Sequence, residues 1–165
     1  MFETAFGLPA HPLLVHAPVV FLPLLALAAI VYSLVPALRG RLRWAVTLLA
    51  LAGPLSAVGA KLTGDAFRRR LTARGVSGAL LAKIDHHNSL GNMTMWTALA
   101  FGVVTLLLVV ATMKRRSAAT DISASTGGRV VQIVLVVATV ALAGATAYYV
   151  IRTGDSGARM AWTGS

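Results

Sequence analysis

The sequence contains no cysteine and few acidic residues, and both features limit what the protein can be. None of the 165 residues is a cysteine, which excludes disulfides, iron–sulfur clusters, thiolate zinc sites and haem attached covalently through paired cysteines. Charged residues make up only 12% of the chain, about half the share in a soluble domain. Because 57% of the residues are hydrophobic, we expect most of the apolar surface to meet lipid.

Basic residues are concentrated between the apolar runs. They form the clusters RGRLR (39–43), RRR (68–70) and KRR (114–116). Clusters that flank membrane spans bind lipid headgroups and set the orientation of the chain. We therefore attribute the net charge of +10 to contact with the lipid bilayer and expect no nucleic acid partner.

Four apolar runs are long enough to cross a bilayer, which takes about 20 residues as a helix. None of them contains Asp, Glu, Lys or Arg. The sequence thus predicts an all-α, polytopic integral membrane protein, with a single domain over residues 1–165. Its four transmembrane helices are expected to form two hairpins. The expected spans are 13–36, 44–60, 88–113 and 130–151.

The segment between the second and third spans, residues 61–85, mixes apolar and basic residues irregularly. This pattern is typical of short amphipathic helices that lie on a membrane surface. We expect such an interfacial segment here, broken near Gly75 and Gly78.

A short repeat follows the second and the fourth span. The triplet TGD occurs at 63–65 and again at 153–155, at corresponding places in the two hairpins. We expect each glycine to end its helix as a C-cap. A carboxylate at a helix C-terminus opposes the helix dipole, so each aspartate is expected to have a cationic or metal partner nearby.

All four histidines lie at the start of an apolar run. His11 and His16 precede the first run, and His86 and His87 precede the third. Successive helices of a bundle with short turns alternate in direction. The histidines are therefore expected to gather on one membrane face, together with the aspartates of both TGD triplets.

Depth and direction distinguish these histidines. His16 lies about 7 Å deeper than His11 if both are helical, and an ionisable residue inside a membrane usually faces the bundle interior. His86 and His87 point about 100° apart on a helix. We expect His87 to point inward, because a stripe of small residues that begins at Gly91 makes room beside it.

Three functions remain open at this point. First, His16 and His87 could hold a b-type haem as axial ligands, with His11 and His86 as further candidates, in an electron-transfer protein. Second, a divalent metal such as zinc or copper could be bound instead. Its candidate ligands are His11, His16, His86, His87, Asp65 and Asp155. Third, the histidines could only cap and pack, in a structural or accessory subunit without a cofactor.

Two other functions are less favoured by the sequence. A solute or ion pathway is disfavoured because no charged residue lies within the spans. An enzyme with its own hydrolytic or transfer chemistry is disfavoured because no nucleophile stands out.

The stretch HPLLVHAP (11–18) resembles the opening of a bacterial family of small predicted membrane proteins, domain of unknown function 2231. The family pattern is close to HPxxVHFPIAL, and Ala17 stands where the family usually has Phe. The TGD after the second span and the histidine before the third are also similar to the family pattern. The resemblance implies four transmembrane helices. Because some relatives look like fusions to Rieske-type or cytochrome-c-type domains, it also points to membrane electron transfer. The matching residues are His11, Pro12, Val15, His16 and Pro18.

The flanks of the first span favour one orientation. No basic residue precedes this span, whereas three arginines follow it within residues 39–43. Basic flanks stay on the cytoplasmic side, and the first helix often dominates. We therefore expect both termini and the histidine cluster on the outer face of a bacterial inner membrane. A redox protein or a second copy of the chain is the expected partner.

Overall fold

The structure is a computed structural model that describes residues 4–5, 8–118 and 126–163. Two-residue strands β1 (Thr4–Ala5) and β2 (Leu8–Pro9) pair antiparallel before the short helix α1 (Ala10–Leu14). Nearly all other described residues belong to long helices. These are α2 (His16–Leu34), α3 (Arg39–Ala73), α4 (Gly78–Ala118) and α5 (Thr126–Thr163), with the 3₁₀ turn η1 (Pro36–Leu38) between α2 and α3.

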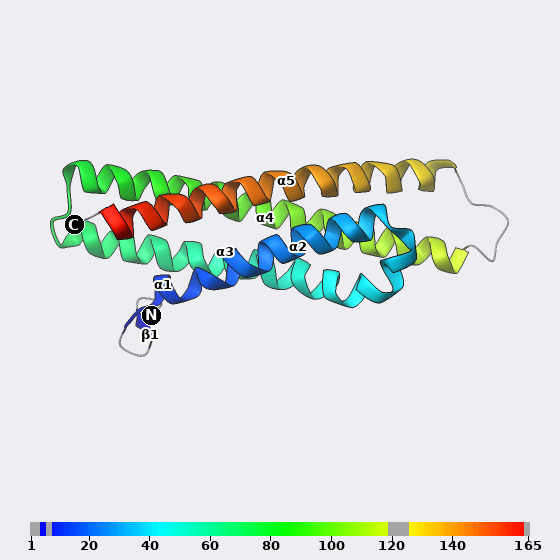
Figure 1. The fold of residues 1–165 in the computed structure, drawn as a ribbon, viewed down its shortest axis with the longest axis horizontal. Coiled ribbons are helices and arrows are strands. Elements are labelled where there is room, and N and C mark those ends of the chain that lie inside the picture. Colours follow the sequence, from blue (N-terminus) through cyan, green and yellow to red (C-terminus); the bar gives the residue numbers. More distant parts are fainter. Residues whose placement is uncertain (1–3, 6–7, 119–125, 164–165) are drawn as a thin grey trace.

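The four long helices form one elongated bundle (Figure 1). Each of them is long and apolar enough to cross a membrane, so the prediction of an all-α protein with four membrane-spanning helices is confirmed. Both ends of the chain lie toward the end of the bundle where α3 turns into α4 (Figure 1). The helices therefore alternate in direction, as the predicted hairpins require.

The bundle is held together by small and apolar side chains between the helices. Leu25 and Phe101 are fully buried in its centre. A Cβ at Gly102 would lie 2.6 Å from Pro54 Cγ and 2.7 Å from the Ala50 carbonyl oxygen. Glycine at this position lets α3 and α4 approach closely, which stabilises helix pairs in lipid through van der Waals contact.

Large apolar side chains also cover the outside of the bundle. Leu27, Leu55 and Val137 are each more than 60% exposed in the isolated chain. In water such a surface would be unfavourable, whereas in a bilayer it meets hydrocarbon. The outward faces of the helices therefore fit a lipid environment.

Residues 61–85 differ from the expected surface-lying segment. Helix α3 continues to Ala73 and α4 begins at Gly78, so both helices extend past their apolar parts as a helical hairpin. The chain reverses where Gly75 has φ +86° and Gly78 has φ +65°, a left-handed conformation that glycine adopts readily. The break is thus at the predicted glycines, but the polar residues on both sides continue the long helices.

Neither TGD triplet ends a helix, so the prediction of two C-caps is wrong. Gly64 lies within α3 and Gly154 lies within α5. Among the glycines that the structure describes, only the two in the α3–α4 turn have positive φ. The polar residues after each triplet are helix-compatible and lie beyond the apolar part of the span, so the helix has no reason to stop there.

Candidate functional site

Two histidine rings lie edge to face at the end of the bundle that carries both termini. The ring centroids of His11 and His87 lie 6.3 Å apart, and their planes are inclined at 76°. Both side chains are partly buried. Since His11 comes from α1 and His87 from α4, the pair connects the two hairpins of the bundle.

A hydrogen bond determines which nitrogen of His11 carries a proton. Its Nδ1 lies 3.0 Å from the carbonyl oxygen of Ala60 in α3. A carbonyl oxygen only accepts hydrogen bonds, so Nδ1 is the donor. The other ring nitrogen, Nε2, is therefore the one left for a ligand.

The same tautomer follows for His87 by a second route. Its Nδ1 lies 2.7 Å from Ser156 Oγ, and Ser156 Oγ donates its own proton to the Thr153 carbonyl oxygen at 2.8 Å. Because a hydroxyl has one proton to donate, Ser156 must accept from His87. His87 thus also leaves Nε2 for a ligand.

The two histidines lie against equivalent parts of α3 and α5. Each part has a backbone carbonyl, a hydroxyl three residues later and a glycine four residues later. We refer to these residues as the histidine cradles. Facing His11 the residues are Ala60, Thr63 and Gly64. Facing His87 they are Thr153, Ser156 and Gly157.

Glycine brings each ring close to the helix backbone. A Cβ at Gly64 would lie 3.0 Å from His11 Cε1, and a Cβ at Gly157 would lie 3.1 Å from His87 Cε1. Both values are shorter than an ordinary van der Waals contact. A side chain at either glycine would therefore push the ring away from its hydrogen-bond partner.

The cradles correct the register of the internal repeat. They relate residues 63–64 to 156–157, three positions later than the TGD match at 153–155. Ser156 and Gly157 were missed because the three identical letters pointed to the earlier position. A hydroxyl residue followed by glycine occurs at 63–64 and 156–157 but also at 153–154, so the sequence pattern alone does not select the later position.

His16 and His86 lie outside the pair. Both are exposed, and His16 Nδ1 contacts only the Leu13 carbonyl oxygen of its own helical turn, at 3.4 Å. The expected pairing of His16 with His87 is therefore not formed. Five residues separate His11 from His16, which is about 140° around a helix, so only one of them can point inward. The inward direction predicted for His87 agrees with the structure.

The aspartates of the TGD triplets are held by cations. Lys61 Nζ lies 2.5 Å from Asp65 Oδ1, and Asn88 Nδ2 donates to the same oxygen at 2.6 Å. Arg159 pairs with Asp155 at 2.9 Å. The expected cationic partners are thus present, one helical turn away in each case.

A divalent metal site made of all six expected residues is not assembled. Within the described ranges, no three His, Asp or Glu side chains come close enough together to hold a metal ion. The carboxylates are engaged with Lys61 and Arg159, and His16 and His86 point outward. Of the six expected ligands, His11 and His87 are the two whose rings lie close together.

The chain was compared with protein families, curated proteins and solved structures. A family model described as a predicted membrane protein (DUF2231) matches residues 7–165. No curated protein and no solved structure matches the chain. The match includes both histidines of the pair and both cradles.

Proposed function

The chain belongs to the DUF2231 family of predicted membrane proteins, and we propose that it is a membrane electron carrier that would hold a b-type haem between His11 and His87. The observation that carries the proposal is the histidine pair. Two partly buried imidazoles from different helices lie edge to face, and each directs its Nδ1 to a protein acceptor. A bound haem would supply reversible one-electron chemistry.

The two rings lie close together, with their centroids 6.3 Å apart. A bound haem would take its two protein ligands from the Nε2 atoms of His11 and His87. Ligating histidines usually donate their other ring N–H to a protein acceptor, and the Ala60 carbonyl and the Ser156 hydroxyl would have this role here.

The number of protein donors favours haem over a zinc ion. Zinc sites take three or four protein ligands, whereas haem iron needs only two axial ligands from the protein. The part of the chain that the structure describes brings together two such donors and no third. Since the sequence has no cysteine, the haem would be held without a covalent bond, as in b-type cytochromes.

The location of the pair suits electron exchange at a membrane surface. Lys61, Asp65 and Asn88 form a linked polar group beside it, at the end of the apolar part of α3. We place this end of the bundle on the outer face of a bacterial inner membrane, following the basic flank of the first span. A redox protein on that face is the expected partner.

The experiment is an absorption spectrum of the detergent-purified protein, oxidised and then reduced with dithionite, with a pyridine haemochrome assay. We expect one b-type haem per chain. The haem should be lost in His11→Ala and His87→Ala. His16→Ala and His86→Ala are matched controls that should keep it.

A colourless protein from cells with ample haem would overturn the haem proposal. Elemental analysis of the same sample then separates the two alternatives. A copper content that depends on His11 and His87 would indicate a two-coordinate copper site. A metal-free protein would indicate an accessory subunit without a cofactor.

A further inference from the structure

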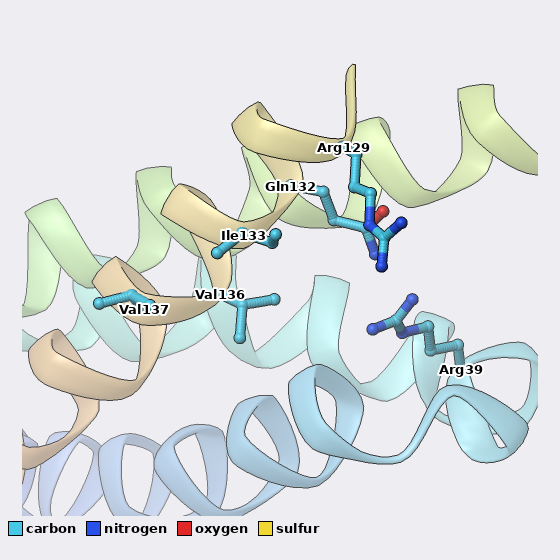
Figure 2. Close-up of a pocket in the computed structure, with 6 residues that line it drawn as sticks. All are labelled: Arg39, Arg129, Gln132, Ile133, Val136 and Val137. Atoms are coloured by element: carbon cyan, nitrogen blue, oxygen red, sulfur yellow. The ribbon is translucent and has the colours of Figure 1, made fainter. Parts of the chain in front are cut away.

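A pocket opens at the other end of the bundle, far from the histidine pair. It lies between the start of α3 and the start of α5 and has a volume of about 390 Å³ (Figure 2). The guanidinium groups of two arginines face each other across it, and apolar side chains follow along α5 (Figure 2). The residues that line it are Arg39, Arg129, Gln132, Ile133, Val136 and Val137.

Arg39 is held in place by the end of α2. Its Nε donates to the Tyr32 carbonyl oxygen at 3.0 Å, and its Nη2 donates to the Ser33 carbonyl oxygen at 2.9 Å. The guanidinium also lies 5.9 Å from the centre of the Tyr32 ring. These contacts use one side of the guanidinium and leave its Nη1 side for a ligand. Because the side chain is already ordered, binding a ligand there costs less conformational entropy.

The pocket is positively charged, which favours an anionic ligand. Among the residues that the structure describes, its lining contains two arginines and no acidic residue. Arginine is suited to phosphate because its planar fork matches two phosphate oxygens. Two arginines on different elements can contact one phosphate from two sides.

The apolar wall indicates where this phosphate comes from. Ile133 and Val137 are 55% and 63% exposed, on the outward face of a membrane-spanning helix. Arg129 stands directly before the apolar run that starts at Val130. The pocket thus has its charge at headgroup depth and its apolar wall toward the hydrocarbon. A soluble anion would leave that wall without a contact.

We propose that this pocket binds an anionic phospholipid. Arg39 and Arg129 hold the headgroup phosphate, and an acyl chain lies along Ile133 and Val137. Basic pockets between transmembrane helices are a general form of headgroup recognition. This proposal does not depend on the haem, because the two sites lie at opposite ends of the bundle.

The experiment measures lipid binding by the full-length protein. The protein is purified in detergent, stripped of lipid, and titrated with phosphatidylglycerol or phosphatidylcholine while its thermal midpoint and its bound lipid by native mass spectrometry are recorded. Wild type should bind phosphatidylglycerol in preference and gain thermal stability. Arg129→Gln should weaken this binding by about tenfold or more, because it removes a charge-assisted hydrogen bond to the phosphate.

Two variants and one further ligand make the test specific. Arg39→Gln should weaken binding similarly, although it also removes bonds to the end of α2, so Arg129→Gln is the decisive variant. Arg41→Gln is the matched control, since Arg41 lies on the same end but does not line the pocket. Equal loss in Arg41→Gln, or unchanged binding in Arg129→Gln, would overturn the proposal. Stabilisation by inorganic phosphate alone, dependent on Arg129, would show a soluble anion site instead.

Discussion

Two hydrogen bonds distinguish the proposed ligands His11 and His87 from His16. His11 and His87 each donate through Nδ1 to a partner on another helix, whereas His16 contacts only its own turn. A ring that is held from one side presents its other nitrogen in a defined direction. The hydrogen-bond partners are therefore as important to the site as the rings themselves.

Replacement of Ser156 by alanine tests this orientation. Ser156→Ala removes the acceptor of His87 Nδ1, and loss of such a partner typically costs about 10–100-fold in affinity for the bound metal centre. We expect weaker haem retention, measured by transfer of haem to apomyoglobin. Ser89→Ala, at an exposed position of α4, is the control. Equal haem retention in both variants would contradict the assigned role of Ser156.

The register of the repeat can be tested with two glycines on α5. At Gly157 an added Cβ would lie 3.1 Å from His87, whereas at Gly154 nothing lies within 4 Å. Gly157→Ala should displace the ring and lower haem retention. Gly154→Ala should keep the haem and stabilise the helix by about 0.5–1 kcal/mol, because alanine is the better helix former. If Gly154→Ala lost haem and stability while Gly157→Ala kept both, the repeat would be aligned on the TGD triplets instead.

Which of His11 and His16 faces inward could not be predicted, because that depends on the rotation of the helix about its axis. The sequence indicated that the histidines share a membrane face, and His11 and His87 do meet there. His16 was favoured over His11 because of its depth. His11 faces inward because its ring packs against Gly64. This contact joins residues that are far apart in the chain, so a local sequence pattern does not reveal it.

At the scale of helices, the membrane spans were predictable and the helix ends were not. Length and the absence of charge identify each apolar run independently of its neighbours. Helix α3 continues through Gly64 and α5 through Gly154, because their last turns lie beyond the apolar part and are stabilised by local ion pairs such as Lys61 with Asp65. A local pattern does not reveal where such a polar extension stops.

Hydroxyl groups between α4 and α5 differ in how well they are paired. Thr94 Oγ1 lies 2.8 Å from Thr153 Oγ1. By contrast, the buried hydroxyls of Thr105, Thr139 and Thr146 have no hydrogen-bond partner among the described residues. An unpaired buried hydroxyl contributes nothing to offset its desolvation cost.

Valine substitutions test this difference between the hydroxyls. Thr146→Val and Thr139→Val should leave the thermal midpoint in detergent unchanged or raise it, because no bond is lost. Thr94→Val should lower the free energy of unfolding by about 0.5–1.5 kcal/mol, because it leaves Thr153 with one partner fewer. A loss of stability in Thr146→Val as large as in Thr94→Val would mean that the Thr146 hydroxyl has a partner, such as an internal water.

At the scale of the whole molecule, the two ends of the bundle have different chemistry. One end carries the histidine pair, both termini and the carboxylates with their cations. The other end carries Arg39, Arg129 and the arginines of the first turn. If the basic turn after the first span is cytoplasmic, the histidine pair faces outward.

Single cysteines provide a direct test of this orientation, because the chain has none of its own. Ala161→Cys introduces a thiol at an exposed position near the end of α5, and Gly40→Cys introduces one at the opposite end. In intact spheroplasts, a membrane-impermeant maleimide should label Ala161→Cys. Gly40→Cys should react only after lysis. The opposite labelling pattern would show that the histidine pair lies on the cytoplasmic side and would contradict the predicted orientation.

The most direct test of the central claim is the electron paramagnetic resonance spectrum of the oxidised protein. With a haem bound between His11 and His87, we predict a low-spin ferric signal, because both axial ligands would be imidazoles. The signal should persist in His16→Ala and should disappear or become high-spin in His11→Ala and His87→Ala. A protein that shows no ferric haem signal after expression with ample haem, or a signal that survives the loss of either His11 or His87, would contradict the account.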